Sequence, residues 1–94
     1  MAVKADARFT GTGEVVSGAV RVFGVHIVSS GTAGRLVLKD GGSGGDTLVD
    51  IDTPSVAESD EVDFGGQGIY FATDVHCSTF SNVDGATLLY EDEP

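Results

Sequence analysis

Short β-rich runs separated by turn residues fill the sequence, and no stretch of it carries a convincing helical period. Runs of this kind, divided by Gly, Ser, Asn and Asp at regular intervals, are typical of β-sandwiches and small barrels. We therefore predict an all-β domain of about eight short antiparallel strands, arranged as a β-sandwich or jelly-roll-like fold, with a small barrel as the competing architecture. The expected strands are residues 4–10, 19–28, 35–39, 47–52, 61–64, 69–72, 75–80 and 86–90.

The strongest strand signal is at residues 19–28, which are apolar at both sets of alternating positions. This pattern predicts a strand that is covered on both sides or that meets a neighbour. Two segments also resemble each other, since Val-His at 25–26 and at 75–76 each lead through a turn to a Leu-rich strand. Two such hairpins, one in each half, would suit a two-sheet sandwich.

The chain is short enough to form one domain over residues 1–94. Residues 1–12 are predicted to form an N-terminal arm, of which residues 4–10 form an edge strand or add a strand to a neighbouring subunit. Residues 91–94 read Glu-Asp-Glu-Pro and are expected to be an acidic tail with nothing to bury.

The net charge of the chain restricts the kinds of partner that it can bind. Fifteen acidic and five basic side chains give a net charge of −10. Phosphate binding needs clustered Lys and Arg, so we expect no nucleic-acid partner. The charge fits a solvated surface, a basic protein partner or bound cations.

Cys77 is the only cysteine, so no disulfide can form within the chain. Stability must come from the core or from association with copies of itself or with another chain. No segment is long and apolar enough to cross a membrane, and we expect no membrane partner. Residues 1–6 lack the pattern of a signal peptide, which predicts synthesis in the cytoplasm.

Residues 41–49 fit one copy of the calcium-binding nonapeptide of parallel β-rolls, in which Asp46 would be a ligand. Those sites need tandem copies, because each ion is shared between successive turns. Residues 50–58 contain no glycine, so the second copy is missing. We therefore interpret residues 40–46 as the flexible tip of a hairpin.

A stripe of carboxylates is formed by Asp50 and Asp52 on one expected strand and by Glu61 and Asp63 on another. If these strands pair, four like charges lie close together, which destabilises the sheet unless Ca²⁺ or a Lys/Arg-bearing partner offsets them. If the strands are not adjacent, the stripe is a solvated sheet face. These four residues and Asp46 are the weak candidates for a metal site, and we expect no cofactor.

No catalytic residue emerges from the sequence. His26 and His76 are expected to be half-buried strand residues, and Cys77 a small buried residue on the face opposite its neighbour His76. Cys77 could still meet His26 across strands, but no Asp or Asn stands out to orient such a pair. Residues 65–68 are Gly-rich but precede a strand instead of a helix, so they do not form a phosphate loop. We expect a protein that is not an enzyme.

Residues 68–76 followed by 86–90, and residues 31–41 leading to 51–54, resemble small β-rich virion proteins of tailed bacteriophages. The shared motifs are structural: a strand, a Gly-rich hairpin tip, a second strand and a Thr-Pro exit. They cover about two thirds of the chain and point to no functional residue.

The resemblance implies a virion component that is made in the host cytoplasm and assembles in many copies. It would be a homo-oligomer that decorates or cements the capsid, in contact with the major capsid or tail proteins. One alternative is an adaptor, collar or fibre-associated protein of the tail. Another is a free-standing module that binds calcium or carbohydrate, for which Tyr70 and Tyr90 are the candidate aromatic platforms.

Overall fold

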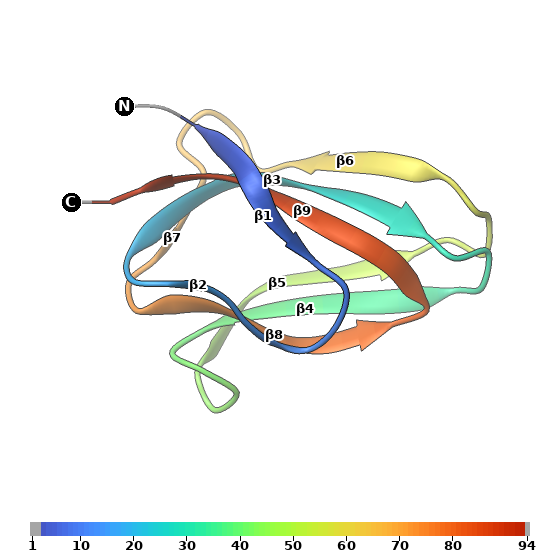
Figure 1. Cartoon of the computed structure of the whole chain (residues 1–94), viewed down its shortest axis with the longest axis horizontal. Helices are drawn as coiled ribbons and strands as arrows, with labels where there is room; N and C mark the ends of the chain where they lie inside the picture. Colours follow the sequence, from blue (N-terminus) through green and yellow to red (C-terminus); the bar gives the residue numbers. More distant parts are fainter. Residues whose placement is uncertain (1–2, 94) are drawn as a thin grey trace.

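The structure, a computed structural model, describes residues 3–93 and contains nine strands and no helix in that range. Accordingly, no membrane-spanning helix occurs among these residues. Two antiparallel sheets pack face to face (Figure 1), which confirms the predicted all-β sandwich. The strands are β1 (Lys4–Phe9), β2 (Gly13–Ser17), β3 (Val20–Ser29), β4 (Gly34–Asp40), β5 (Asp46–Thr53), β6 (Ser59–Asp63), β7 (Ile69–Phe71), β8 (Asp74–Ser81) and β9 (Val83–Asp92).

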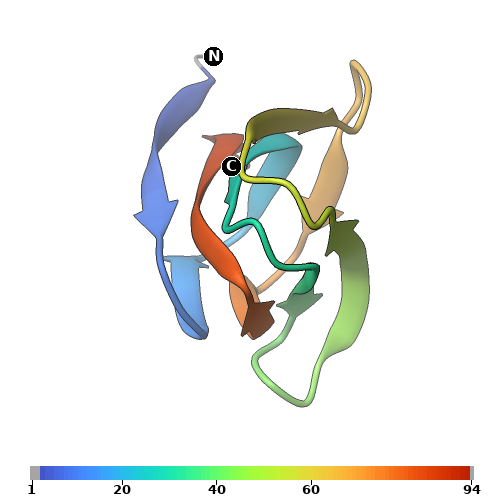
Figure 2. The same ribbon diagram turned by 90° about the vertical axis from the view of Figure 1, so that its right-hand side faces the viewer.

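Each sheet has its own strand order. The upper sheet of Figure 1 runs β1-β9-β3-β6, with β7 also paired to β3. The lower sheet runs β2-β8-β4-β5. Figure 2 looks along the sandwich and shows β5 and β6 on one side of it, with β1 and β2 on the other.

Alternate residues of the strands fill the space between the sheets. The two longest strands, β3 and β9, lie side by side in the upper sheet and supply much of this core. Burial of the apolar side chains contributes roughly 25 cal/mol per Å² and is the main stabilising term in a chain without disulfides. The buried core residues are Val20, Val22, Val25, Ile27, Leu36, Leu38, Val49, Phe71, Val75, Cys77, Val83, Ala86, Leu88 and Tyr90.

The second edge of β3 is shared by β6 and β7. β6 pairs with residues 24–28 and β7 with residues 20–22. Between them, the Phe64 N–H donates to the Phe23 carbonyl at 2.9 Å, and residues 65–68 loop away from the sheet. β6 and β7 therefore act as one long edge strand beside β3, which the Gly-rich residues 65–68 interrupt.

The prediction of about eight strands misses β2. Its sequence, Gly-Glu-Val-Val-Ser, does not alternate and is flanked by glycines, so it resembles a turn. A register shift between Glu14 and Val16, where β2 pairs with β8, accommodates the two adjacent valines as half-buried residues.

The first and last strands both belong to the upper sheet. Residues 4–9 form β1, which pairs with β9 of the same chain, while Met1 and Ala2 lie outside the described residues. At the other end β9 continues to Asp92, and Glu91 is only 8% exposed, which differs from the expected acidic tail. Glu91 lies opposite Arg21 of β3, and the Arg21 guanidinium donates to the Glu93 carboxylate at 3.3 Å, so this basic residue ties the end of β9 to β3.

The two similar segments are crossings between the sheets, and the expectation of two hairpins is wrong. β3 belongs to the upper sheet and β4 to the lower, whereas β8 and β9 make the same crossing in the opposite direction. Asn82 links the crossings: its carbonyl accepts the Ser30 hydroxyl at 2.8 Å, and its side-chain amide donates to the Ala33 carbonyl at 3.0 Å. Its φ of 55° is a left-handed conformation that Asn tolerates.

Candidate functional site

The hairpin predicted at residues 40–46 is present between β4 and β5, and its base is held by two carboxylates. Asp40 accepts the backbone N–H groups of residues 72–74, at 2.8–3.3 Å. Asp74 in turn accepts the N–H groups of Gly41 at 2.9 Å and Gly42 at 3.2 Å. The tip is therefore braced against the turn that joins β7 to β8.

These contacts argue against a calcium site at the tip of the 40–46 hairpin. The amides of the loop point at a carboxylate, and the Lys39 ammonium group donates to the Ser43 carbonyl at 3.1 Å. Asp46, the candidate ligand, is exposed at the start of β5. The loop thus directs its polar atoms toward other groups of the chain.

The carboxylate stripe is divided between two sheets. Asp50 and Asp52 lie on β5 and Glu61 and Asp63 on β6, and these are end strands of different sheets that do not pair (Figure 2). Within residues 3–93, no group of three or more His, Cys, Asp or Glu side chains is placed to hold a metal ion. The structure therefore does not bring the five candidate ligands together.

Asp50 is the stripe residue with an ionic partner. The Arg35 guanidinium donates to both of its carboxylate oxygens, at 2.8 and 2.6 Å. This hydrogen bonding outweighs desolvation and holds the pKa of Asp50 below its ordinary value. Both side chains are about half exposed, so the pair contributes little to the stability of the fold.

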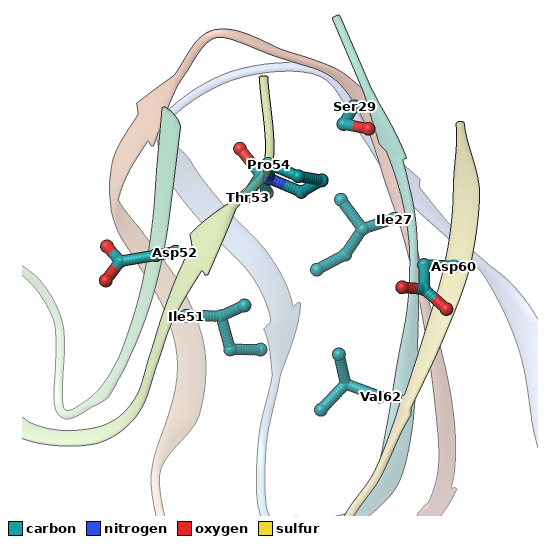
Figure 3. Close-up of a pocket in the computed structure, with 8 residues that line it drawn as sticks. All are labelled: Ile27, Ser29, Ile51, Asp52, Thr53, Pro54, Asp60 and Val62. Carbon is teal, nitrogen blue, oxygen red and sulfur yellow. The ribbon is translucent and has the colours of Figure 1, made fainter. Parts of the chain in front are cut away.

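A small cleft, here called the side cleft, lies between β5 and β6 (Figure 3). Ile27, Ile51 and Val62 point toward one another across it, whereas the Asp52 carboxylate points away on the other side of β5. The space inside it that admits a water molecule is about 40 Å³, far below the roughly 300–1,000 Å³ of typical small-molecule sites. The remaining lining residues are Ser29, Thr53, Pro54 and Asp60.

The histidines and the cysteine do not form a site. His26 lies on β3 and His76 on β8, in different sheets, and each is half-buried as predicted. Cys77 faces the core, whereas His26 alternates with the core residues Val25 and Ile27 and therefore faces outward. A Cys77–His26 nucleophilic pair is thus ruled out by the geometry.

The Cys77 thiol is expected to react with a water-soluble disulfide reagent about a hundredfold more slowly in the folded protein than in denaturant. Burial raises its pKa to about 11, and the side chain is 0% exposed. Stopped-flow labelling at pH 8, in buffer and in urea, measures the ratio. Equal rates would show that the core around β8 is open to solvent.

The two tyrosines differ in accessibility. Tyr90 is 7% exposed and its hydroxyl donates to Asp6 at 2.8 Å, so its ring is not available for a sugar to stack on. Tyr70 is 45% exposed, and the Arg21 guanidinium lies 5.4 Å from its ring centroid. Tyr70 is therefore an accessible aromatic group beside a cation.

The outward side chains of β3 and β9 form a surface that we call the outer face. All six of its residues are half-buried and lie outside the core, and the buried Glu91 of β9 adjoins them opposite Arg21. The register places Leu89 opposite Gly24, next to Phe23, and Thr87 opposite His26. The outer face comprises Arg21, Phe23, His26, Val28, Thr87 and Leu89.

Further groups extend the outer face at its margins. Tyr70 of β7 lies opposite Arg21, and Arg8 of β1 lies opposite Thr87. The Arg8 guanidinium covers Gly85, in the space that a larger side chain would fill. Arg8 makes no ion pair or hydrogen bond with any of residues 3–93. Two arginines, a tyrosine and three apolar side chains thus share a surface of an acidic protein, and Glu61 of β6 lies opposite His26 at the other margin.

No motif in the sequence singles out Phe23, Val28, Leu89 or Arg8. The sequence carries one signal of this surface: residues 19–28 are apolar at both sets of alternating positions, which predicts a strand covered on both sides or one that meets a neighbour. In the structure one side of β3 packs on the core and the other is the half-exposed outer face.

Comparison of the chain with models of known protein families, with curated proteins and with solved structures finds no match.

Proposed function

We propose that the chain is a non-enzymatic structural protein of a phage particle, which decorates or cements the capsid in many copies through its outer face. The observation that carries the proposal is the outer face itself. Phe23, Val28 and Leu89 keep part of their apolar surface exposed on two central strands, where a partner could cover them.

The composition of the outer face is that of a protein–protein interface. Interface centres are enriched in Tyr, Phe and Arg and depleted in Asp, Glu and Lys. Phe23, Tyr70, Arg8 and Arg21 gather on or beside this face, although the whole chain has only three Arg, five Phe and two Tyr. Covering this surface would bury apolar area at roughly 25 cal/mol per Å².

The charge of the rest of the molecule suits a repeated, solvent-facing unit. With a net charge of −10, free copies repel one another in solution and stay soluble. On a particle, the outer face would contact the shell, and the carboxylates on β5 would remain in water. The resemblance of residues 31–54 and 68–90 to small phage virion proteins supports the same assignment.

Mass spectrometry of purified particles from the phage that encodes the chain tests the proposal, with cryo-electron microscopy to locate it. We expect the chain in tens to hundreds of copies on the capsid surface. Density on the tail instead would favour an adaptor, collar or fibre-associated role. Absence of the chain from the particles would reject both placements.

Leu89→Glu is expected to weaken attachment to the particle at least about tenfold, because it places an unpaired carboxylate in the interface. The matched control is Val56→Glu, at a 56%-exposed residue in the loop between β5 and β6. Occupancy is measured by adding each purified variant to particles that lack the protein. Equal occupancy of both folded variants would show that the outer face is not the attachment surface.

A further inference from the structure

The side of the sandwich that carries β5 and β6 combines an unpaired strand edge with an apolar cleft. β5 ends the lower sheet and, within the described residues, pairs only with β4. Residues 49–53 pair with residues 34–38 without a register shift, so this part of the edge is regular. Such an edge presents N–H and C=O groups that can pair with another strand.

The other end strands are less suited to accept a strand. β1 has a register shift between Lys4 and Ala7, and β2 has one between Glu14 and Val16. Shifts of this kind bend and twist an edge and oppose strand addition. β6 is short and ends at the loop of residues 65–68. The regular part of β5 is therefore the most receptive edge of the molecule.

The side cleft provides an apolar floor beside this edge. Ile27, Ile51 and Val62 line it from β3, β5 and β6 (Figure 3). Because side chains alternate along a strand, every second residue of a strand added to β5 would point toward these residues. The intervening residues would point to the outer side of the lower sheet, where Asp52 lies.

Charge identifies the kind of strand that fits. All five Lys and Arg residues precede residue 40, whereas residues 40–94 hold thirteen of the fifteen acidic ones. Among the described residues of β5 and β6, Asp50 alone forms an ion pair. Asp52, Asp60 and Glu61 are exposed and form no ion pair in this range, although Asp52 lies opposite Arg35. A second copy would bring Asp50 and Asp52 against like charges, which disfavours it as the occupant.

We propose that β5 binds, by strand addition, an extended segment of another protein in which basic and apolar residues alternate. Backbone hydrogen bonds to residues 49–53 supply affinity. The apolar side chains cover the side cleft, and the basic side chains point to the outer side of β5, where Asp50 and Asp52 lie. The same carboxylates keep copies of this chain from pairing edge to edge. The proposal does not depend on the outer face or on a phage particle.

Calorimetric titration of the full chain with a blocked eight-residue peptide of alternating lysine and valine tests the proposal. We expect saturable one-to-one binding that weakens when NaCl is raised from about 0.05 to about 0.5 M. Hydrogen exchange followed by NMR should show slower exchange of backbone amides in residues 49–53. The control peptide carries the same side chains but is N-methylated at alternate residues, which removes the hydrogen-bond donors of one edge.

The variant Asp52→Asn is expected to weaken binding about two- to fivefold. Its control, Glu14→Gln, removes the same charge from an exposed residue of β2 and should leave the affinity within about twofold. Three results would each overturn the proposal: no binding, equal binding of the N-methylated peptide, or equal losses in the two variants.

Discussion

Replacing Gly34 with alanine is expected to lower the free energy of unfolding by about 3 kcal/mol or more. Gly34 begins β4 at the point where three strands meet. A Cβ at this position would overlap with the carbonyl oxygen of Ser81 and would lie 2.9 Å from the Thr53 hydroxyl oxygen and 3.0 Å from Asn82 Cβ. Because backbone atoms on a paired strand cannot move away cheaply, either β4 or β8 must shift.

The measurement is thermal unfolding followed by far-ultraviolet circular dichroism. For a domain of this size, the loss corresponds to a fall in Tm of more than about 10 °C. Gly44→Ala is the matched control, since nothing lies within 4 Å of a Cβ there and its φ is outside the left-handed region. We expect it to change stability by less than about 1 kcal/mol. If Gly34→Ala melted within a few degrees of the parent protein, the close approach of β4 and β8 would be disproved.

The fold class follows from the sequence because local patterns determine it. The lengths of the apolar runs and the turn residues between them predict strands, and the absence of a helical period leaves no competing element. The pattern also predicts that residues 19–28 are covered on both sides or meet a neighbour, and β3 does meet neighbouring strands on both of its edges. Both conclusions rest on neighbouring residues, which one sequence displays in full.

The assignment of strands to sheets is not local, and there the predictions fail. A turn of four residues can close a hairpin or carry the chain from one sheet to the other, and residues 30–33 do the latter. The same limit applies to the carboxylate stripe. Whether Asp52 and Glu61 repel each other depends on whether β5 and β6 pair, and nothing near either residue encodes that.

The outer face shows a third limit. Phe23 and Leu89 are far apart in the sequence and become neighbours only because β3 pairs with β9. Binding and catalytic motifs are recognised as clustered or regularly spaced polar residues, and the residues of this surface are neither clustered nor regularly spaced in the sequence. The sequence does carry one signal of this surface. β3 has more apolar residues than its core-facing side can hold, so some of them lie on its other side.

Replacing Asp40 with alanine is expected to destabilise the fold by about 2 kcal/mol at pH 7, because the N–H groups of residues 72–74 lose a charged acceptor. The loss is modest for three hydrogen bonds because Ala72 and Thr73 are exposed, so water can replace part of the interaction. Asp46→Ala is the matched control: Asp46 is the register partner of Asp40 across the hairpin, is exposed and has the same charge. We expect it to leave the free energy of unfolding within about 0.5 kcal/mol of the parent value.

The effect of Asp40 should depend on pH in a defined direction. Desolvation alone would raise the pKa of this carboxyl, but the N–H donors of Thr73, Ala72 and Asp74 outweigh it and hold the pKa below the ordinary value of 3.8. The unfolded chain therefore binds a proton at a higher pH than the folded chain, so the stabilisation is complete well above pH 3.8 and is lost as the pH falls through the folded pKa. Urea unfolding at several pH values should show the difference between the parent protein and Asp40→Ala shrinking below about pH 4. A difference that stayed constant down to about pH 2 would show that the carboxylate charge contributes nothing and that shape alone holds the hairpin against residues 72–74.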